Sequence, residues 1–536
     1  MAEYHQVLAC CLTARRWLDT HSADGAALVL HNLWADPAAS GPTAGAPYDA
    51  TSGHVRVVPY PQMAETSVQE LLHLVKIYYT TRTVVFHLQS LYLQVELQHH
   101  IMCQAFSKDQ WDLEVRKTSK ETRGFSVCIA LDFGDAGVVS FVAPPDKISV
   151  KVHLESSFQA LPSQPPDVYL EYPRFLQGVA DWLRELAGTK DTEYTKLAVT
   201  AIQEADNVFG GMGPYTTNEV FFLAGLSPFL TVHEVFGCAS RTARLCEAFW
   251  TLAHEAHTTL PDFLAPLYRG TVLAATREQR AAFDAHLHIH GKASARLSPR
   301  MKALLDHYTH TAERRSADTT RPFLRHGIGG LWDVFEPTLL RPALEKPAHA
   351  GPRLPHLVFG PIEWAVNGGA RPRPRDPLSA AFAALGVQPD APTNLELSRY
   401  RAAPFLPPAA LHAESAPVRV YAGAACAHAL WTLTPQVPLD ARAAFRSGRR
   451  DQELHPVAHA HRLTLRHVAA HTREYAAGPL EHPAVAALAG DRERDAVPAE
   501  LDLRTVAAQS AGGAPKGRRS GAFRFAVVPW SKIPAT

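Results

Sequence analysis

Residues 71–102 read LLHLVKIYYTTRTVVFHLQSLYLQVELQHHIM and form the most apolar stretch of the chain. The stretch follows Ser67-Val-Gln-Glu70, a capping-box pattern that satisfies the first free amides of a helix. Its apolar side chains keep helical spacing but almost encircle the axis, which is typical of a buried helix. The β-branched run Thr80–Val85 is the expected break. The assignment of this stretch decides the fold class, and its spacing predicts a buried helix or helix pair.

The period of the pattern changes after residue 124. Apolar residues alternate with smaller or polar ones over Phe125–Phe133 and Ile148–Leu154, and Gly134–Gly137 and Pro144–Asp146 supply turns. Such alternation predicts a three-stranded antiparallel meander over residues 125–155. Helical spacing then returns in five segments, at residues 175–186, 194–209, 219–230, 240–257 and 299–310. The predicted fold class is therefore mainly α with a small antiparallel β-sheet (α+β).

The composition also changes along the chain. The first 200 residues carry 8 Lys and 8 Arg, whereas the remaining 336 carry 5 Lys and 32 Arg and most of the proline. We predict three parts: an N-terminal arm and Pro/Gly loop at 1–53, a mainly helical core with the meander at 54–335, and an Ala/Pro/Arg-rich region at 336–536 that ends in a C-terminal packing segment.

Overall charge and cysteine usage bound the class of protein. The 536 residues carry a net charge of +1, and a protein that grips nucleic acid with one dedicated basic face would carry a larger surplus. Seven scattered cysteines without C-x-x-C spacing indicate reduced thiols and a cytoplasmic location. The longest apolar run, Val220–Val232, is shorter than the ~20 residues that span a bilayer, and no signal peptide is recognised. We expect a soluble protein without a membrane partner.

Histidine is abundant, with 28 residues, so short clusters are expected by chance. His254 and His257 lie one residue closer together than the two histidines of an H-E-x-x-H zinc site. His286, His288 and His290 would share one face of a strand, and their Asp-x-His-x-His opening resembles amidohydrolase barrels, but the many parallel strands of a barrel do not follow. We predict no metal and no cofactor; a metal-dependent hydrolase that uses these three histidines is kept as an alternative.

The sequence lacks the common catalytic motifs. It contains no G-x-x-x-x-G-K-[ST] and no G-x-S-x-G, and Gly210–Gly213 is followed at once by Pro214, so no phosphate-cradling loop after a strand is expected. A basic patch near the C-terminus supplies candidate nucleic-acid contacts, namely Lys516, Arg518 and Arg519. We predict that the chain is not an enzyme.

Two stretches, Glu70–His100 and Pro214–Leu230, resemble in texture the coat proteins of small double-stranded RNA viruses, in particular partitiviruses. The resemblance covers roughly residues 55–310. It implies a helical shell domain with a protrusion in the Ala/Pro/Arg-rich region. It also implies a structural, self-assembling icosahedral capsid that encloses double-stranded RNA, with the genome and a viral polymerase as partners and the virion as its location.

The two ends of the chain carry apolar residues that suit contacts between subunits. The predicted intersubunit residues are Trp17, Trp34 and Trp530, and the predicted partner is the chain itself in a large homo-oligomer. A cytosolic helical scaffold or adaptor is the remaining alternative, and it predicts a monomer or a small oligomer.

Overall fold

The fold consists of two compact units. Unit 1 comprises Met1–Gln164, His257–Ala285 and Thr464–Thr536, and unit 2 comprises Pro165–Ala256 and His286–Leu463. The computed structural model describes residues 3–22, 27–35, 48–49, 54–58, 72–97, 101–116, 125–143, 150–189, 191–273, 275, 279, 282–283, 286–290, 292, 294–317, 333–360, 376–387, 400, 404–411, 417–419, 421–425, 428–433, 455–456 and 526–527. The predicted division at residues 53 and 335 stays a prediction.

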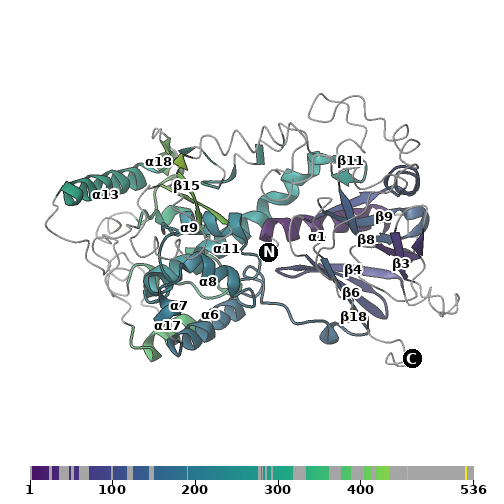
Figure 1. Ribbon diagram of the computed structural model, residues 1–536, viewed down its shortest axis with the longest axis horizontal. Helices are drawn as coiled ribbons and strands as arrows, with labels where there is room; N and C mark the ends of the chain where they lie inside the picture. Colours follow the sequence, from purple (N-terminus) through teal and green to yellow (C-terminus); the bar gives the residue numbers. More distant parts are fainter. Residues whose placement is uncertain are drawn as a thin grey trace, which may run out of the picture. The chain divides into compact units, whose positions relative to one another are not determined.

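Unit 1 contains two sheets (Figure 1). The six-stranded antiparallel sheet has the order β2 (Tyr48–Asp49), β3 (His54–Val58), β1 (Asn32–Ala35), β8 (Ser126–Asp132), β9 (Val138–Ala143) and β7 (Met102–Phe106). The five-stranded sheet has the order β18 (Ala526–Val527), β10 (Val150–Glu155), β6 (Leu91–Leu97), β5 (Thr83–Leu88) and β4 (Leu74–Tyr79), and it is antiparallel except for the β18–β10 pair. A short hairpin pairs β11 (Tyr268–Arg269) with β12 (Val272–Leu273).

One apolar core joins the two sheets to the N-terminal helix α1 (Tyr4–Ser22). Phe86 of β5 meets Phe141 of β9 edge to face, with ring centroids 6.1 Å apart. Val7, Cys11 and Trp17 of α1 are buried in the same cluster. The inner faces of the sheets therefore form a β-sandwich that α1 helps to close.

The predicted helix pair at residues 71–102 is wrong, because these residues form β4, β5, β6 and the start of β7. In β5 the consecutive residues Val84, Val85 and Phe86 are all fully buried. A strand that is covered on both faces has no polar side and therefore reads as a continuous apolar run. Periodicity alone does not distinguish such a run from a buried helix.

The predicted meander is split between the two sheets. β8 and β9 pair with each other around the turn Gly134–Gly137, where the amide of Phe133 donates to the carbonyl of Gly137 at 2.9 Å. β10 instead crosses to the other sheet and pairs with β6 from Val150↔Leu97 to Glu155↔Tyr92. Turn residues after β9 marked the end of a strand but did not determine where the next strand pairs.

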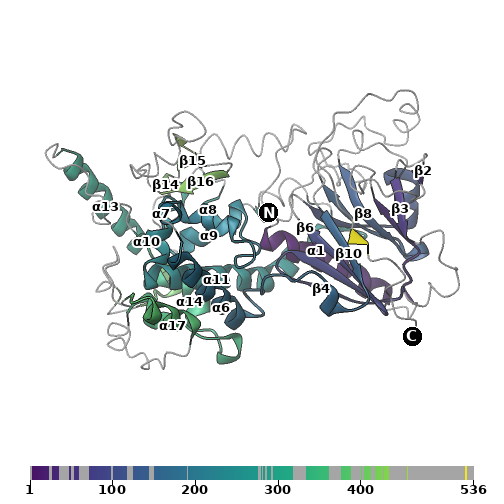
Figure 2. The ribbon, with the colours of Figure 1, turned by 60° about the horizontal axis from the view of Figure 1, so that its bottom comes forward.

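Unit 2 is mainly helical (Figure 2). Its helices are α6 (Tyr172–Ala187), α7 (Asp191–Tyr194), α8 (Ala198–Glu204), α9 (Pro214–Leu223), α10 (Val232–Phe236), α13 (Pro299–Ala317), α14 (Arg341–Leu344), α15 (Pro355–Val358), α17 (Pro377–Ala384) and α18 (Pro408–Leu411), together with α11 (Ala239–Leu264), whose last turns belong to unit 1. Its short strands are β13 (Ser294–Ala295) with β14 (Val418–Arg419), and β16 (His428–Thr432), β15 (Tyr421–Ala425) and β17 (His455–Pro456).

The predicted α+β class with antiparallel sheets is confirmed. Within the part of the chain that the structure describes, no helix is long and apolar enough to cross a membrane.

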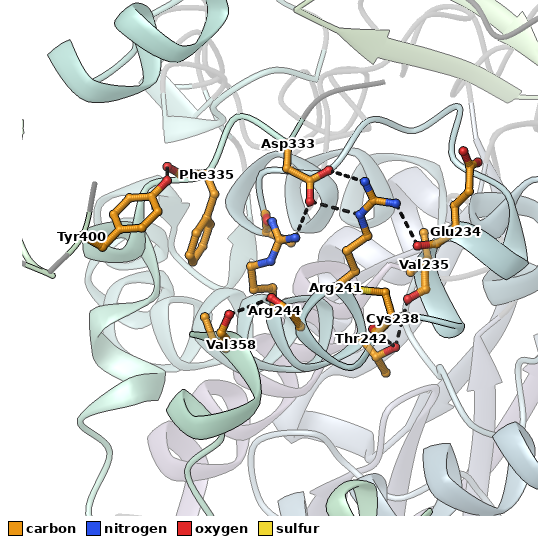
Figure 3. Close-up of polar contacts among 12 residues, drawn as sticks. Glu234, Val235, Cys238, Arg241, Thr242, Arg244, Asp333, Phe335, Val358 and Tyr400 are labelled. Atoms are coloured by element: carbon orange, nitrogen blue, oxygen red, sulfur yellow. Dashed lines mark hydrogen bonds and ion pairs between the residues drawn. The ribbon is translucent and has the colours of Figure 1, made fainter. Parts of the chain in front are cut away.

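A buried aspartate ties the segment after residue 332 to α11 (Figure 3). Asp333 Oδ1 lies 2.9 Å from Nη2 of Arg241, and Oδ2 lies 3.0 Å from Arg241 Nε and 2.5 Å from Arg244 Nη2. Burial alone would raise the pKa of Asp333, but the two guanidinium groups outweigh it and hold that pKa below its usual value. The amide of Val334 donates to the carbonyl of Gly225 at 2.9 Å. Gly225 has φ +67°, and a Cβ there would lie 2.5 Å from Cα of Phe335, so this close approach requires glycine.

We expect Phe141→Ala to lower the free energy of unfolding by about 3–5 kcal/mol, because it leaves a cavity between the two sheets. Phe158→Ala is the matched control, since Phe158 is 46% exposed and its loss is expected to change stability by less than about 0.5 kcal/mol. Urea unfolding of the full chain measures both. Equal midpoints for the two variants would contradict a continuous core between the sheets.

We expect Asp333→Asn to cost about 3–5 kcal/mol, since it leaves two buried guanidinium groups without a counter-charge. Asp306→Asn, which removes the half-exposed partner of Lys302, is expected to cost less than about 1 kcal/mol. The pKa of Asp333 is lower in the folded state, so its contribution is complete above the unfolded value of about 3.9 and disappears as the pH falls through the folded value. Unfolding curves at pH 7 and pH 3 should therefore differ more for the wild type than for Asp333→Asn.

Candidate functional site

A glycine-rich turn joins α8 to α9 in unit 2. Gly213 is the N-cap of α9 and Pro214 occupies its first turn, where the missing amide of proline has no helical partner to lose. Gly211 has φ +82°, a conformation that favours glycine. The hydroxyl of Thr217 donates to the carbonyl of Gly213 at 2.8 Å and fixes the start of the helix. The expectation that no strand precedes this loop holds, but Pro214 starts a helix there.

Three main-chain amides of this turn donate no hydrogen bond to the part of the chain that the structure describes. Among the described residues, none accepts a hydrogen bond from the amides of Gly210, Gly211 or Gly213, although all three residues are buried. Buried amides are nearly always paired, so amides without an acceptor among the described residues are available to an oxygen acceptor such as a ligand or a water. The amides lie beside the positive end of the ten-residue helix α9. Such an arrangement suits a phosphate oxygen.

Glu219 in the middle of α9 anchors a neighbouring loop. Its Oε2 accepts the amide of His288 at 2.7 Å, and its Oε1 accepts the amides of Ile289 at 2.9 Å and His290 at 2.7 Å. The carboxylate is 1% exposed. Because Glu219 lies within the apolar run 214–230, its carboxylate is buried and needs hydrogen-bond donors from another segment. A single acidic residue in an apolar run was therefore the sequence signal for a loop that packs against α9.

The three histidines proposed as weak metal ligands lie on this loop. The ring of His288 stacks on Phe222 at 5.1 Å, and the ring of His290 meets the edge of Tyr215 at 5.8 Å. Tyr215 and Phe222 are two helical turns apart, or roughly 10 Å, so the two imidazoles are directed to different places. His286 is exposed. No group of three His, Cys, Asp or Glu side chains within the described ranges is arranged to hold a metal ion.

The predicted contact residues at the ends of the chain fall into two groups. Trp17 is buried, and its indole donates to the carbonyl of Ala136 at 3.2 Å, while Trp34 is buried with the guanidinium of Arg116 at 4.7 Å from its ring. Intersubunit contacts through these two residues stay a prediction. Their burial within one chain does not favour it, because little of either side chain is accessible to a second subunit. Lys516, Arg518, Arg519 and Trp530 lie outside the described residues.

A cluster of titratable groups surrounds the start of α1 in unit 1. Nε2 of His257 lies 3.1 Å from the hydroxyl of Tyr4 and 2.7 Å from that of Tyr79. Burial, together with His257, lowers the pKa of His5 to about 4. Glu3 in the same turn is also buried. A buried group with a shifted pKa, such as His5, beside other titratable side chains is typical of functional sites, although sequence spacing alone could not bring α1, β4 and α11 together.

A second cluster in unit 2 combines Ser379, His356 and Asp376 but does not form a catalytic triad. Nε2 of His356 lies 2.9 Å from Ser379 Oγ and 3.2 Å from Asp376 Oδ2, so serine and aspartate share one ring nitrogen. In a triad they occupy opposite nitrogens. Asp376 instead caps α17 by accepting the amide of Ser379 at 2.8 Å. This cluster is a helix cap.

Comparisons with known proteins give structural matches only. No protein-family profile and no curated protein matches the sequence. Formamido-pyrimidine DNA glycosylase (Fpg, MutM) of Lactococcus lactis, non-covalently bound to DNA with an AP site, aligns with 55% of this chain and 89% of its own, at 16% identity and a TM-score of 0.36. Its complex with a THF-DNA and an inhibitor aligns with 54% and 88%, at 15% identity and 0.35. MutM with carbocyclic 8-oxo-G containing DNA aligns with 53% and 86%, at 14% identity and 0.33.

These findings correct the predicted identity and function. The resemblance to partitivirus coat proteins is wrong, because the first stretch that carried it, predicted to be helical, consists of strands of a β-sandwich. The predictions of a capsid protein and of a chain that is not an enzyme fall with it, and His286, His288 and His290 do not form the metal site that the hydrolase alternative requires. Self-association stays a prediction. Over about half its length, the chain is similar to the Fpg/MutM DNA glycosylases.

Proposed function

We propose that this protein binds duplex DNA through the turn between α8 and α9 and acts on damaged or abasic nucleotides. The observation that carries the proposal is that the amides of three buried residues, Gly210, Gly211 and Gly213, have no acceptor among the described residues and lie next to the N-terminus of α9. Phosphate contacts from main-chain amides and helix N-termini position proteins on DNA. The aligned glycosylase structures, which contain abasic-site or 8-oxo-G DNA, agree with this proposal.

The proposal accounts for the near-neutral charge of the chain. A protein that holds phosphates with lysine and arginine needs a surplus of these residues, whereas this chain has a net charge of +1. Main-chain amides bind phosphate without adding any charged residue. Glu219 supports the same place, since it fixes the loop 288–290 against α9.

The cluster at the start of α1 is a separate candidate, within unit 1, for the groups that perform the chemistry. Cleavage of a glycosidic bond requires proton transfer, and carboxylates and imidazoles are the usual donors and acceptors. We assign these roles to Glu3 and His257. His5 is unsuited to donate a proton at neutral pH, because a group with a pKa of about 4 is already neutral there.

We expect Gly211→Ala to weaken binding of the full chain to a labelled 20-base-pair duplex with a central tetrahydrofuran site by about tenfold or more. The added Cβ disfavours φ +82° and moves the amides of the turn. Gly386→Ala is the matched control, since Gly386 has φ +69° at the end of α17 and open space around it. Fluorescence anisotropy at fixed salt measures both. Equal losses in the two variants, or none in either, would remove the turn from the interface.

We expect Glu3→Gln and His257→Gln to slow base excision or strand cleavage by about 10²–10⁴-fold, the usual contribution of a general acid or base. The substrates are duplexes with one 8-oxo-guanine or one abasic site, and His310→Gln on the exposed side of α13 is the control. Wild-type rates in both variants would show that Glu3 and His257 do not take part in catalysis. If the wild type has no activity on either substrate but its DNA binding depends on Gly211, the protein binds DNA and the proposed catalysis is wrong.

A further inference from the structure

The outer face of the five-stranded sheet carries aromatic side chains in register. Lys76 lies opposite His87, His87 opposite Tyr92, and Tyr92 opposite Glu155. Directly opposite residues share one face of a sheet, and the alternate residues Phe86 and Leu93 are buried in the core. This row therefore faces away from the sandwich core.

Four rings on this side form one surface. His87 stacks on Tyr92 with centroids 4.4 Å apart and planes 3° apart. Phe158, from the 3₁₀ turn Phe158–Ala160 after β10, meets the edges of Tyr92 at 5.9 Å and Tyr78 at 6.2 Å. Phe158 is 46% exposed, and the other three rings are half-buried. We call Tyr78, His87, Tyr92 and Phe158 the aromatic face.

Cations exceed carboxylates around the aromatic face. Lys76 Nζ lies 4.9 Å from the centroid of the Tyr78 ring and is exposed. Arg82 and Lys151 lie 3.4 Å and 3.5 Å from the same carboxylate oxygen of Glu96, so one carboxylate is shared by two cations. Glu155 at the end of the first row is a second acidic group among the described residues. Partly exposed rings beside cationic side chains complement a chain of bases and phosphates.

We propose that the aromatic face binds single-stranded DNA by stacking on unpaired bases, with Lys76 and Lys151 contacting the phosphates. Bases in a duplex stack on each other and do not offer their faces, so the ligand must contain unpaired bases. The site is separate from the α8–α9 turn and does not depend on the function proposed for that turn. A second copy of the chain is the competing occupant.

The test measures binding of fluorescein-labelled dT12 to the full chain by anisotropy. We expect Phe158→Ala and Lys76→Gln each to weaken binding by about fivefold or more, because one stacked base or one phosphate contact is lost. Leu170→Ala and Lys302→Gln are the controls, since Leu170 is 60% exposed and Lys302 lies on a surface helix, both in unit 2. Gly211→Ala should keep dT12 binding while it loses duplex binding, which separates this proposal from the previous one.

Two further measurements can overturn the proposal: competition by inorganic polyphosphate, and sedimentation of the protein alone. Polyphosphate has phosphates but no rings, so it should compete with dT12 far less well than unlabelled dT12 at equal charge. Equal competition, or unchanged dT12 binding by Phe158→Ala, would rule out stacking. Self-association that Phe158→Ala abolishes would assign the face to a second copy. Thermal melting confirms that each variant is folded, and the variants other than Gly211→Ala should also retain duplex binding.

Discussion

Buried carboxylates that require donors determine how the late part of this chain attaches to its helical unit. Four such carboxylates, each almost inaccessible to solvent, bind groups that are far away in sequence. Glu219 accepts hydrogen bonds from the amides of residues 288–290, and Glu247 binds Lys346 and the amide of Leu354. Asp333 binds Arg241 and Arg244, and Glu336 binds Arg300 and Ser298. A buried charge without a partner costs several kcal/mol, so each carboxylate restricts where its partner segment lies. Part of the arginine enrichment after residue 200 thus has a structural role inside the fold.

Sequence reasoning recovered β8, β9 and α6 but missed the strands between residues 74 and 97. β8 was predicted from alternation, β9 from the turns on either side of it, and α6 from helical spacing with one exposed face. β6 also alternates, since Tyr92, Gln94 and Glu96 lie between apolar residues, but the run Val84–Phe86 in β5 is buried on both faces and made the whole stretch resemble a buried helix. The pairing of β10 with β6 depends on the path of the whole chain, which no local pattern encodes.

The candidate site was missed for a different physical reason. Its proposed ligands are main-chain amides, and every residue except proline has one, so composition and motif spacing do not reveal them. The visible signal was Gly210-Gly-Met-Gly213, which was excluded as a phosphate-cradling loop after a strand because Pro214 follows it at once. Proline at the first turn of a helix is favourable, and the same residues therefore mark the N-terminus of α9. The histidine cluster attracted attention instead, although its main role is to present main-chain amides to Glu219.

The two proposed contacts with nucleic acid divide the work between phosphate and base. Amide dipoles at the α8–α9 turn recognise a phosphate by geometry and release few counterions, because they add no formal charge; the binding energy they supply therefore depends less on salt than lysine contacts do. The aromatic face instead recognises base surface, with Lys76 and Lys151 as its salt-dependent part. A chain with a net charge of +1 can bind a polyanion in this way, because neither contact needs an extended basic surface. The near-neutral net charge therefore argues against binding through an extended basic surface but does not exclude nucleic-acid binding as such.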